Sequence, residues 1–174
     1  MATGKMFYIT KAPDTCEDFS SSSLDERLDS LGIDYASNVD EITAKQDIQD
    51  FANRLMDAGF NIQFPTKEET MAFPDMAFKI CSTDVKSRQE MKENYFRRVF
   101  ANCRKAMEDM TLADFASDSI AVSSLRLKLN NTCGDMVWFN GDSLIDMCYT
   151  MDEFIRHMYA GVCYYISKNV VLLH

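Results

Sequence analysis

The sequence predicts an α+β fold dominated by helices, in which two long amphipathic helices pack with a small sheet or hairpins. Apolar residues recur at helical spacing over about 84–110 and 143–160, and shorter stretches alternate between apolar and polar residues. With 174 residues, 47% of them hydrophobic, the chain is long enough to form one domain, residues 1–174, with a substantial core. An all-α bundle is the alternative.

The strongest helical pattern covers residues 84–110. On a helical wheel its apolar residues fall within an arc of about 140°, which is the width of a core-facing stripe. The stripe consists of Tyr95, Phe96, Val99, Phe100, Cys103, Ala106, Met107 and Met110. Phe100 is therefore predicted to be a core residue.

The first two turns of this helix fit the stripe less well, because Arg88 and Lys92 rotate toward its apolar side. We expect the buried part to begin near Tyr95 and the earlier turns to project into solvent. Ser82 or Thr83 is the predicted N-cap.

A second long helix is predicted over 143–160, with Ser143 as its cap and Gly161 as the residue that ends it. The apolar residues beyond it are interpreted as a terminal hairpin around Ser167-Lys168-Asn169. The final strand, Val170–Leu173, needs a cover, because an exposed apolar edge promotes aggregation.

The remaining predicted elements are shorter. In order, they are a strand at 5–10, helices at 23–31 and 40–58, a strand at 60–64, a short helix from Thr66, and a strand or helical turn at 76–81. Thr66 and Glu69 match a capping box. The helix at 40–58 has one apolar face, formed by Ile48, Phe51, Ala52, Leu55 and Ala58. Residues 125–139 are interpreted as a β-hairpin, with a helix over 119–129 as the competitor. Residues 11–23 are acidic and rich in serine, which is typical of a flexible loop.

Charge is distributed unevenly along the chain, whose net charge is −9. Residues 86–105 carry 7 basic and 2 acidic side chains, whereas the rest of the chain sums to −14. Four cations opposite the apolar stripe form the candidate anion- or partner-binding face: Arg97, Arg98, Arg104 and Lys105. Such a face usually pairs with neighbouring acidic side chains, and the alternative is that it binds a phosphate or an acidic partner.

The cysteines and the N-terminus indicate where the protein resides. The six cysteines show no Cys-x-x-Cys spacing, and the N-terminus lacks the sustained apolar run of a secretory signal. We therefore expect reduced, structural thiols and an intracellular protein, in the cytoplasm or the nucleus. The uncharged run at 158–167 is too short to cross a bilayer, so no membrane partner is expected.

No catalytic, cofactor-binding or metal-binding residues are predicted, and the chain is not expected to be an enzyme. Its six glycines form neither a Gly-x-Gly-x-x-Gly fingerprint nor a P-loop. Gly141 and Ser143 do not form a nucleophile elbow, because Ile145 stands where the last glycine is needed. Glu153 and His157 share a helix face, where an exposed ion pair is far more common than a metal site.

These observations favour a non-catalytic intracellular protein–protein interaction or structural protein that self-associates. The alternative is an RNA-binding protein that uses the basic helix, with aromatic pairs such as Trp138 and Phe139 as candidates for base stacking. The negative charge of the other segments repels nucleic acid, so a protein partner or a second copy of the chain is the stronger expectation. A viral accessory or structural protein would also fit, although no residue carries that assignment.

Overall fold

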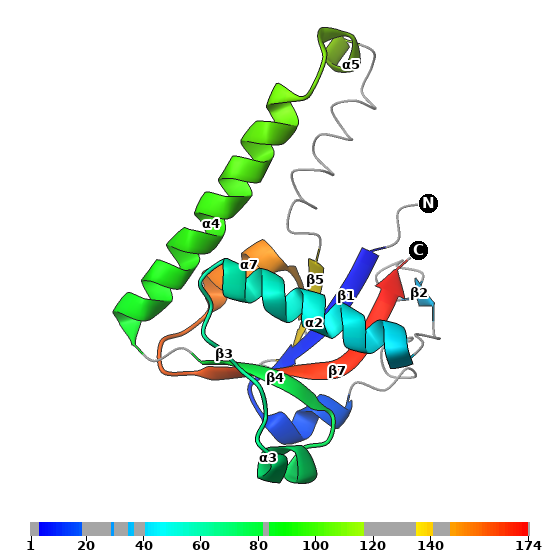
Figure 1. The fold of residues 1–174 in the computed structure, drawn as a ribbon, viewed down its shortest axis with the longest axis vertical. Helices are drawn as coiled ribbons and strands as arrows, with labels where there is room; N and C mark the ends of the chain where they lie inside the picture. The colour runs from blue at the N-terminus through cyan, green and yellow to red at the C-terminus, as the bar shows by residue number, and fades with distance from the viewer. Residues whose placement is uncertain are drawn as a thin grey trace.

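The computed structural model describes residues 4–18, 29, 35–36, 41–81, 84–116, 135–140 and 147–173. At its centre is a mixed seven-stranded sheet, not the small sheet predicted from the sequence (Figure 1). The strands are β1 (Gly4–Thr10), β2 (Tyr35–Ala36), β3 (Ile62–Gln63), β4 (Met76–Cys81), β5 (Asp135–Asn140), β6 (Met147–Thr150) and β7 (Cys163–Leu173). Their order is β3-β4-β7-β1-β5-β6, and β2 pairs with the carboxyl end of β7.

The predicted helix-dominated fold and its all-α alternative are both wrong, because this sheet organises the chain. One cause lies in the segment predicted as a second long helix, 143–160. Met147–Thr150 form strand β6, which pairs with β5, and among the described residues of this segment only Met151–His157 form a helix, α7. Tyr149 and Thr150 suit a strand, and pairing with β5 decides between two patterns that the apolar spacing alone does not separate.

Strand β7 joins the two halves of the sheet. It pairs antiparallel with β4, β1 and β2 along its 11 residues. The predicted turn at 167–169 is instead a register irregularity, where the buried Ser167 hydroxyl accepts a hydrogen bond from the Asn169 N–H and donates one to the Cys16 carbonyl. The apolar end of the strand is covered, as expected, since Val170 and Val171 pair with β1 and are buried.

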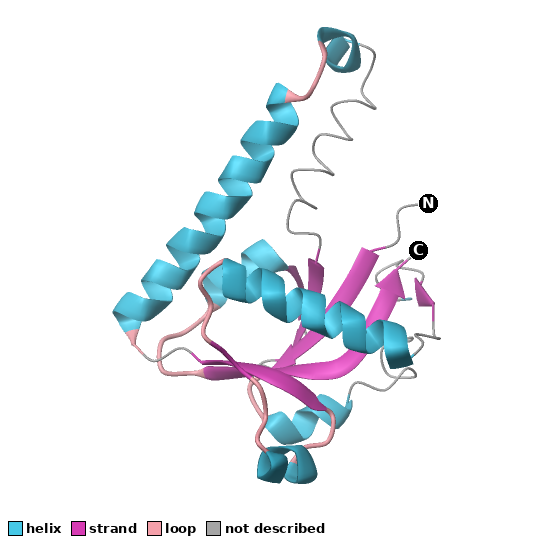
Figure 2. Cartoon of the chain, in the orientation of Figure 1, coloured by secondary structure: helices cyan, strands magenta, loops and turns pink. Residues whose placement is uncertain are grey.

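Helix α2 (Glu41–Asp57) crosses one face of the sheet and forms the main core with it (Figure 2). The predicted apolar face is confirmed, because four of its five members are buried: Phe51, Ala52, Leu55 and Ala58. The Phe51 ring stacks on Phe7 of β1, with centroids 4.0 Å apart, and lies 6.0 Å from Phe78 of β4. This aromatic cluster joins α2 to the centre of the sheet.

The short 3-10 helix η1 (Pro13–Asp18) lies on the other side of the sheet, against β1, β4 and β7 (Figure 2). It falls within the predicted loop at 11–23, of which residues 19–23 lie outside the described part of the chain. Cys16 of η1 is fully buried. Burial, and then the charges of Asp75 and Asp14, raise the pKa of this thiol to about 12.

Helix α3 (Lys67–Ala72) begins at the predicted capping box. The Thr66 hydroxyl accepts a hydrogen bond from the Glu69 N–H at 3.2 Å, and the Glu69 carboxylate accepts one from the Thr66 N–H at 2.9 Å. The predicted strand at 125–129 and its helical competitor lie outside the described residues, as does the predicted helix at 23–31 apart from Asp29.

Helix α4 (Val85–Glu108) confirms the long helix predicted over 84–110. Its N-cap is Asp84, whose carboxylate accepts the Ser87 N–H at 2.7 Å, and not Ser82 or Thr83. The helix projects from the sheet as an arm, with α5 (Leu112–Ala116) at its far end (Figure 1). Packing against the sheet therefore covers only part of α4.

We expect Phe51→Ala to lower the free energy of unfolding by about 3–5 kcal/mol, because it leaves a cavity between α2 and the sheet. Phe100→Ala removes the same atoms from a side chain that is 68% exposed, so it should cost less than about 1 kcal/mol. Urea unfolding of both variants measures the difference. Equal losses would contradict the assignment of the core.

Stability should also fall above pH 9, because the Cys16 thiol ionises near pH 9.0 in the unfolded chain but stays protonated to about 12 in the fold. The protonated thiol contributes fully to the free energy of unfolding below pH 9. This contribution is lost as the pH rises toward 12, at up to about 1.4 kcal/mol per pH unit. Chemical unfolding between pH 7 and 10.5 should show a shallower decline for Cys16→Ala. Parallel profiles would contradict the burial of this thiol.

Candidate partner-binding site on helix α4

Three basic side chains of helix α4 attach it to the body of the protein. Each donates a hydrogen bond to a backbone carbonyl at or just beyond the carboxyl end of another helix. The bonds run from Arg88 Nη1 to the Met158 carbonyl (3.0 Å), from Lys92 Nζ to the Arg156 carbonyl (3.0 Å) and from Arg98 Nη1 to the Arg54 carbonyl (3.1 Å). The carboxyl end of a helix carries partial negative charge, so cations stabilise it. These residues thus fasten α4 to the ends of α7 and α2.

Gly59, directly after α2, allows α4 to approach closely. Its φ of 88° lies in the left-handed region, and the Phe60 N–H closes the helix end with a 3.0 Å bond to the Leu55 carbonyl. A Cβ at this position would lie 2.8 Å from Asn94 Nδ2 of α4. The glycine therefore serves both the turn and the helix contact.

The buried part of α4 lies earlier than predicted. Met91 and Tyr95 are buried, and the Tyr95 ring meets Phe60 edge to face at 6.1 Å. Docking therefore begins at Arg88 and Met91, about one to two turns before Tyr95. The first turn is exposed as expected, since Val85 is 64% exposed. Phe100 is not a core residue, because its side chain is 68% exposed. The apolar stripe identified from the sequence exists but is only partly covered.

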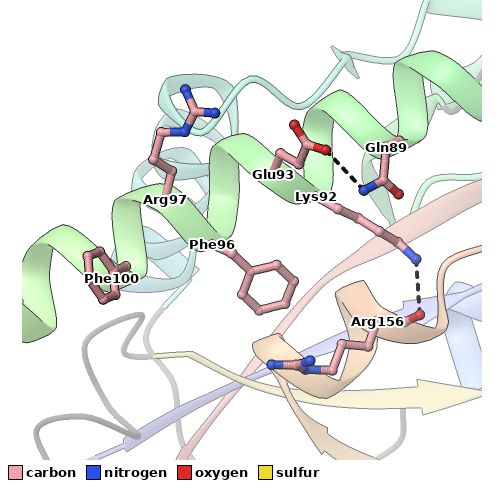
Figure 3. Close-up of a pocket in the computed structure, with 7 residues that line it drawn as sticks. All are labelled: Gln89, Lys92, Glu93, Phe96, Arg97, Phe100 and Arg156. Atoms are coloured by element: carbon pink, nitrogen blue, oxygen red, sulfur yellow. Dashed lines mark hydrogen bonds between the residues drawn. The ribbon is translucent and has the colours of Figure 1, made fainter.

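An open groove of about 520 Å³ separates α4 from α7 (Figure 3). Its lining residues are Gln89, Lys92, Glu93, Phe96, Arg97, Phe100 and Arg156. The Arg156 guanidinium lies 4.6 Å from the centre of the Phe96 ring, within the range of a cation–π contact. The floor of the groove is therefore aromatic, and its rim is mostly cationic.

Beyond the groove, an apolar seam continues along α4. It consists of Phe96, Phe100, Cys103 and Met107. Their spacing of i, i+4, i+7 and i+11 places them on one face, as in a helix that pairs with another helix. Phe100 and Met107 are 68% and 59% exposed. Large apolar side chains exposed together at this spacing indicate a surface for a partner.

The four cations of the predicted binding face are all exposed but differ in their surroundings. Arg98 anchors α4 to α2, and Arg104 is paired with Glu108 at 3.2 Å. Arg97 lies at the rim of the groove (Figure 3). Lys105 lies on the side of the helix away from the seam. The sequence did not identify Phe96 and Arg156 as a site, since helical periodicity does not show which neighbouring helix a residue faces.

Metal-binding groups and smaller hollows are the other places in the described part of the chain where a site could lie. There, no three His, Cys, Asp or Glu side chains gather into a metal-binding group. Glu153 and His157 both lie on the exposed side of α7. A hollow of about 70 Å³ between η1 and the end of α3 has only Asp14 and Asp75 as titratable lining groups. The α4 groove is therefore the candidate functional site.

Comparison with protein-family models, with curated proteins and with solved structures finds no match to this chain. Among the helices within the described residues, none is long and apolar enough to span a bilayer. The assignment of the candidate site therefore depends on the geometry of the groove and the seam.

Replacing Arg88 with Met should lower the free energy of unfolding by about 1–2 kcal/mol, because the Met158 carbonyl loses a charged donor where α4 meets α7. Arg97→Met is the matched control on the exposed side and should change stability by less than about 0.5 kcal/mol. Thermal and urea unfolding of both variants provide the measurement. The anchoring role would be contradicted if the two variants were equally stable.

Proposed function

We propose that this chain is a non-catalytic protein–protein interaction protein whose α4 groove and seam bind an amphipathic helix of a partner protein. The observation that carries the proposal is the exposed seam from Phe96 to Met107, which leads out of a groove with an aromatic floor. An amphipathic helix fits such a surface, because apolar residues at i, i+3, i+4 and i+7 occupy a groove in this mode of recognition. The absence of paired cysteine spacing favours the cytoplasm or the nucleus as the setting.

The charges around the seam favour an acidic partner. Arg97 flanks it on one side, about 60° from Phe100 and about 80° from Met107 on a helical wheel. Arg156 faces the seam from α7 (Figure 3). Arg97 has no hydrogen bond or ion pair among the residues that the structure describes, so its charge is available to a partner. Carboxylates flanking the apolar side of a bound helix would meet these cations, which selects the partner and its orientation.

Self-association through two α4 helices is less favourable. The helix carries 7 basic and 3 acidic residues, so two copies side by side bring like charges together. A self-associating chain would have to place a different, acidic surface against α4. We therefore favour an acidic helix from another protein, and the oligomeric state is measured alongside binding.

RNA binding, the alternative function, has less support. Of the seven cations in 86–105, Arg88, Lys92 and Arg98 bond to carbonyls of the body, and two more pair with glutamates four residues away. Few charges are left to displace counterions from a polyanion. Trp138, a candidate for base stacking, is buried.

The test uses two labelled three-heptad peptides with leucines at the a and d positions, one with glutamates and one with lysines at the flanking positions. Fluorescence anisotropy should show micromolar binding of the acidic peptide and at least about tenfold weaker binding of the basic one. Phe100→Ala and Arg97→Glu should each weaken acidic-peptide binding. Met71→Ala, which changes an exposed methionine on α3, should leave binding unaltered.

Equal affinity for the two peptides, or none for either, would refute the proposal. Submicromolar, salt-sensitive binding of single-stranded RNA that Arg97→Glu with Lys105→Glu abolishes would assign the surface to nucleic acid instead. This double variant leaves Arg98 in place, because Arg98 anchors α4 to α2. Sedimentation velocity of the free protein identifies a competing homo-oligomer.

A further inference from the structure

Two cysteines from distant parts of the sequence lie opposite each other on adjacent strands of the sheet. Cys81 is the last residue of β4, Cys163 is the first residue of β7, and the antiparallel register places them directly opposite. Both are partly exposed and unbridged. They lie on the same side of the sheet as Lys79 and Tyr165, where small solutes have access.

The backbone hydrogen bonds define the geometry of this pair. The Cys81 N–H donates to the Asn61 carbonyl at 2.8 Å, on the side of β4 that faces away from β7. Since the N–H and C=O of a strand residue point to the same neighbour, Cys81 and Cys163 form a non-hydrogen-bonded pair. In such a pair the Cα atoms are about 4.5 Å apart and the side chains are close. A disulfide spans Cα distances of about 4.4–6.8 Å, so it fits without a change of register.

We propose that Cys81 and Cys163 form a reversible oxidation site, which closes to an intramolecular disulfide when a disulfide oxidant such as oxidised glutathione is present. One thiolate attacks glutathione disulfide, forms a mixed disulfide and releases one glutathione. The second thiolate attacks the protein sulfur of that mixed disulfide and releases the second glutathione. The dithiol loses two electrons and two protons, and one glutathione disulfide becomes two glutathione molecules. This site is independent of the proposed partner-binding function.

The thiol chemistry of the pair is consistent with a reduced resting state. Burial, and then the neighbouring Cys163, raise the pKa of the Cys81 thiol above its ordinary value. The thiolate fraction is therefore small near neutral pH, and closure should accelerate as the pH rises toward 9. Cys16, by contrast, is fully buried with a pKa of about 12 and should not react.

The position of the bridge gives it a structural consequence. Cys81 lies three residues before the N-cap of α4, and Cys163 follows α7, so the closed loop contains both helices that form the groove. Long loops give a disulfide its largest effect on the unfolded chain. Oxidation should therefore raise the melting temperature, by roughly 5–10 °C.

The test treats the reduced full-length protein with a glutathione redox series, quenches it by alkylation and digests it with trypsin without reduction. Mass spectrometry should find residues 80–86 linked to residues 157–168, with the loss of two hydrogen masses. The link should be absent from Cys81→Ser and Cys163→Ser and retained in Cys103→Ser. Dithiothreitol should remove both the link and the rise in melting temperature.

Glutathione adducts at Cys81 and Cys163 without a link between them would overturn the proposal, because they would show two accessible but separate thiols. The proposal would also be overturned if both thiols were alkylated at every redox ratio, or if disulfide links were distributed among all the cysteines. The Cys103→Ser variant separates these outcomes from non-specific oxidation, because Cys103 lies on α4, away from this pair.

Discussion

The attachment of α4 by cations at the carboxyl ends of α2 and α7 is the constraint on which the site depends. Arg88, Lys92 and Arg98 bond to these ends, and Gly59 lets the helix approach. Together these contacts fix the direction in which α4 leaves the body. These contacts end at Arg98, and further along the seam Phe100 and Met107 are exposed. The groove between α4 and α7 lies at the start of the seam.

Local signals predicted local structure well. The capping box at Thr66 depends on contacts within one helix. The apolar face around Phe51 packs against the core, and its spacing alone identifies it as the buried side of the helix. The predictions failed where distant pairing decides the outcome. Met147–Thr150 form a strand because β5 is available to pair with them. The polar residues at 167–169 stay within β7 because the Ser167 hydroxyl bonds to the Cys16 carbonyl, 151 positions away in the sequence.

The candidate site shows the same limit. The sequence identified α4, its apolar stripe and its cationic character, but not which cations are structural. Arg88 and Lys92 were expected to face solvent because they interrupt the stripe, yet they are the residues that reach the backbone of the body. Phe100 was expected in the core because periodicity shows that a face is apolar, not what covers it. Separating anchoring cations such as Arg98 from available ones such as Arg97 requires the tertiary structure.

The central claim is that contacts from Arg88 to Val99 fasten α4 and that the seam beyond them is exposed. Amide hydrogen exchange of the free protein, resolved along α4, tests it directly, because protection reports the free energy of local opening. We predict strong protection over Met91–Val99 and markedly weaker protection over Cys103–Glu108, with the change near Phe100. Uniform strong protection along the whole helix would contradict the account, since it would mean that the seam is already covered within the folded chain.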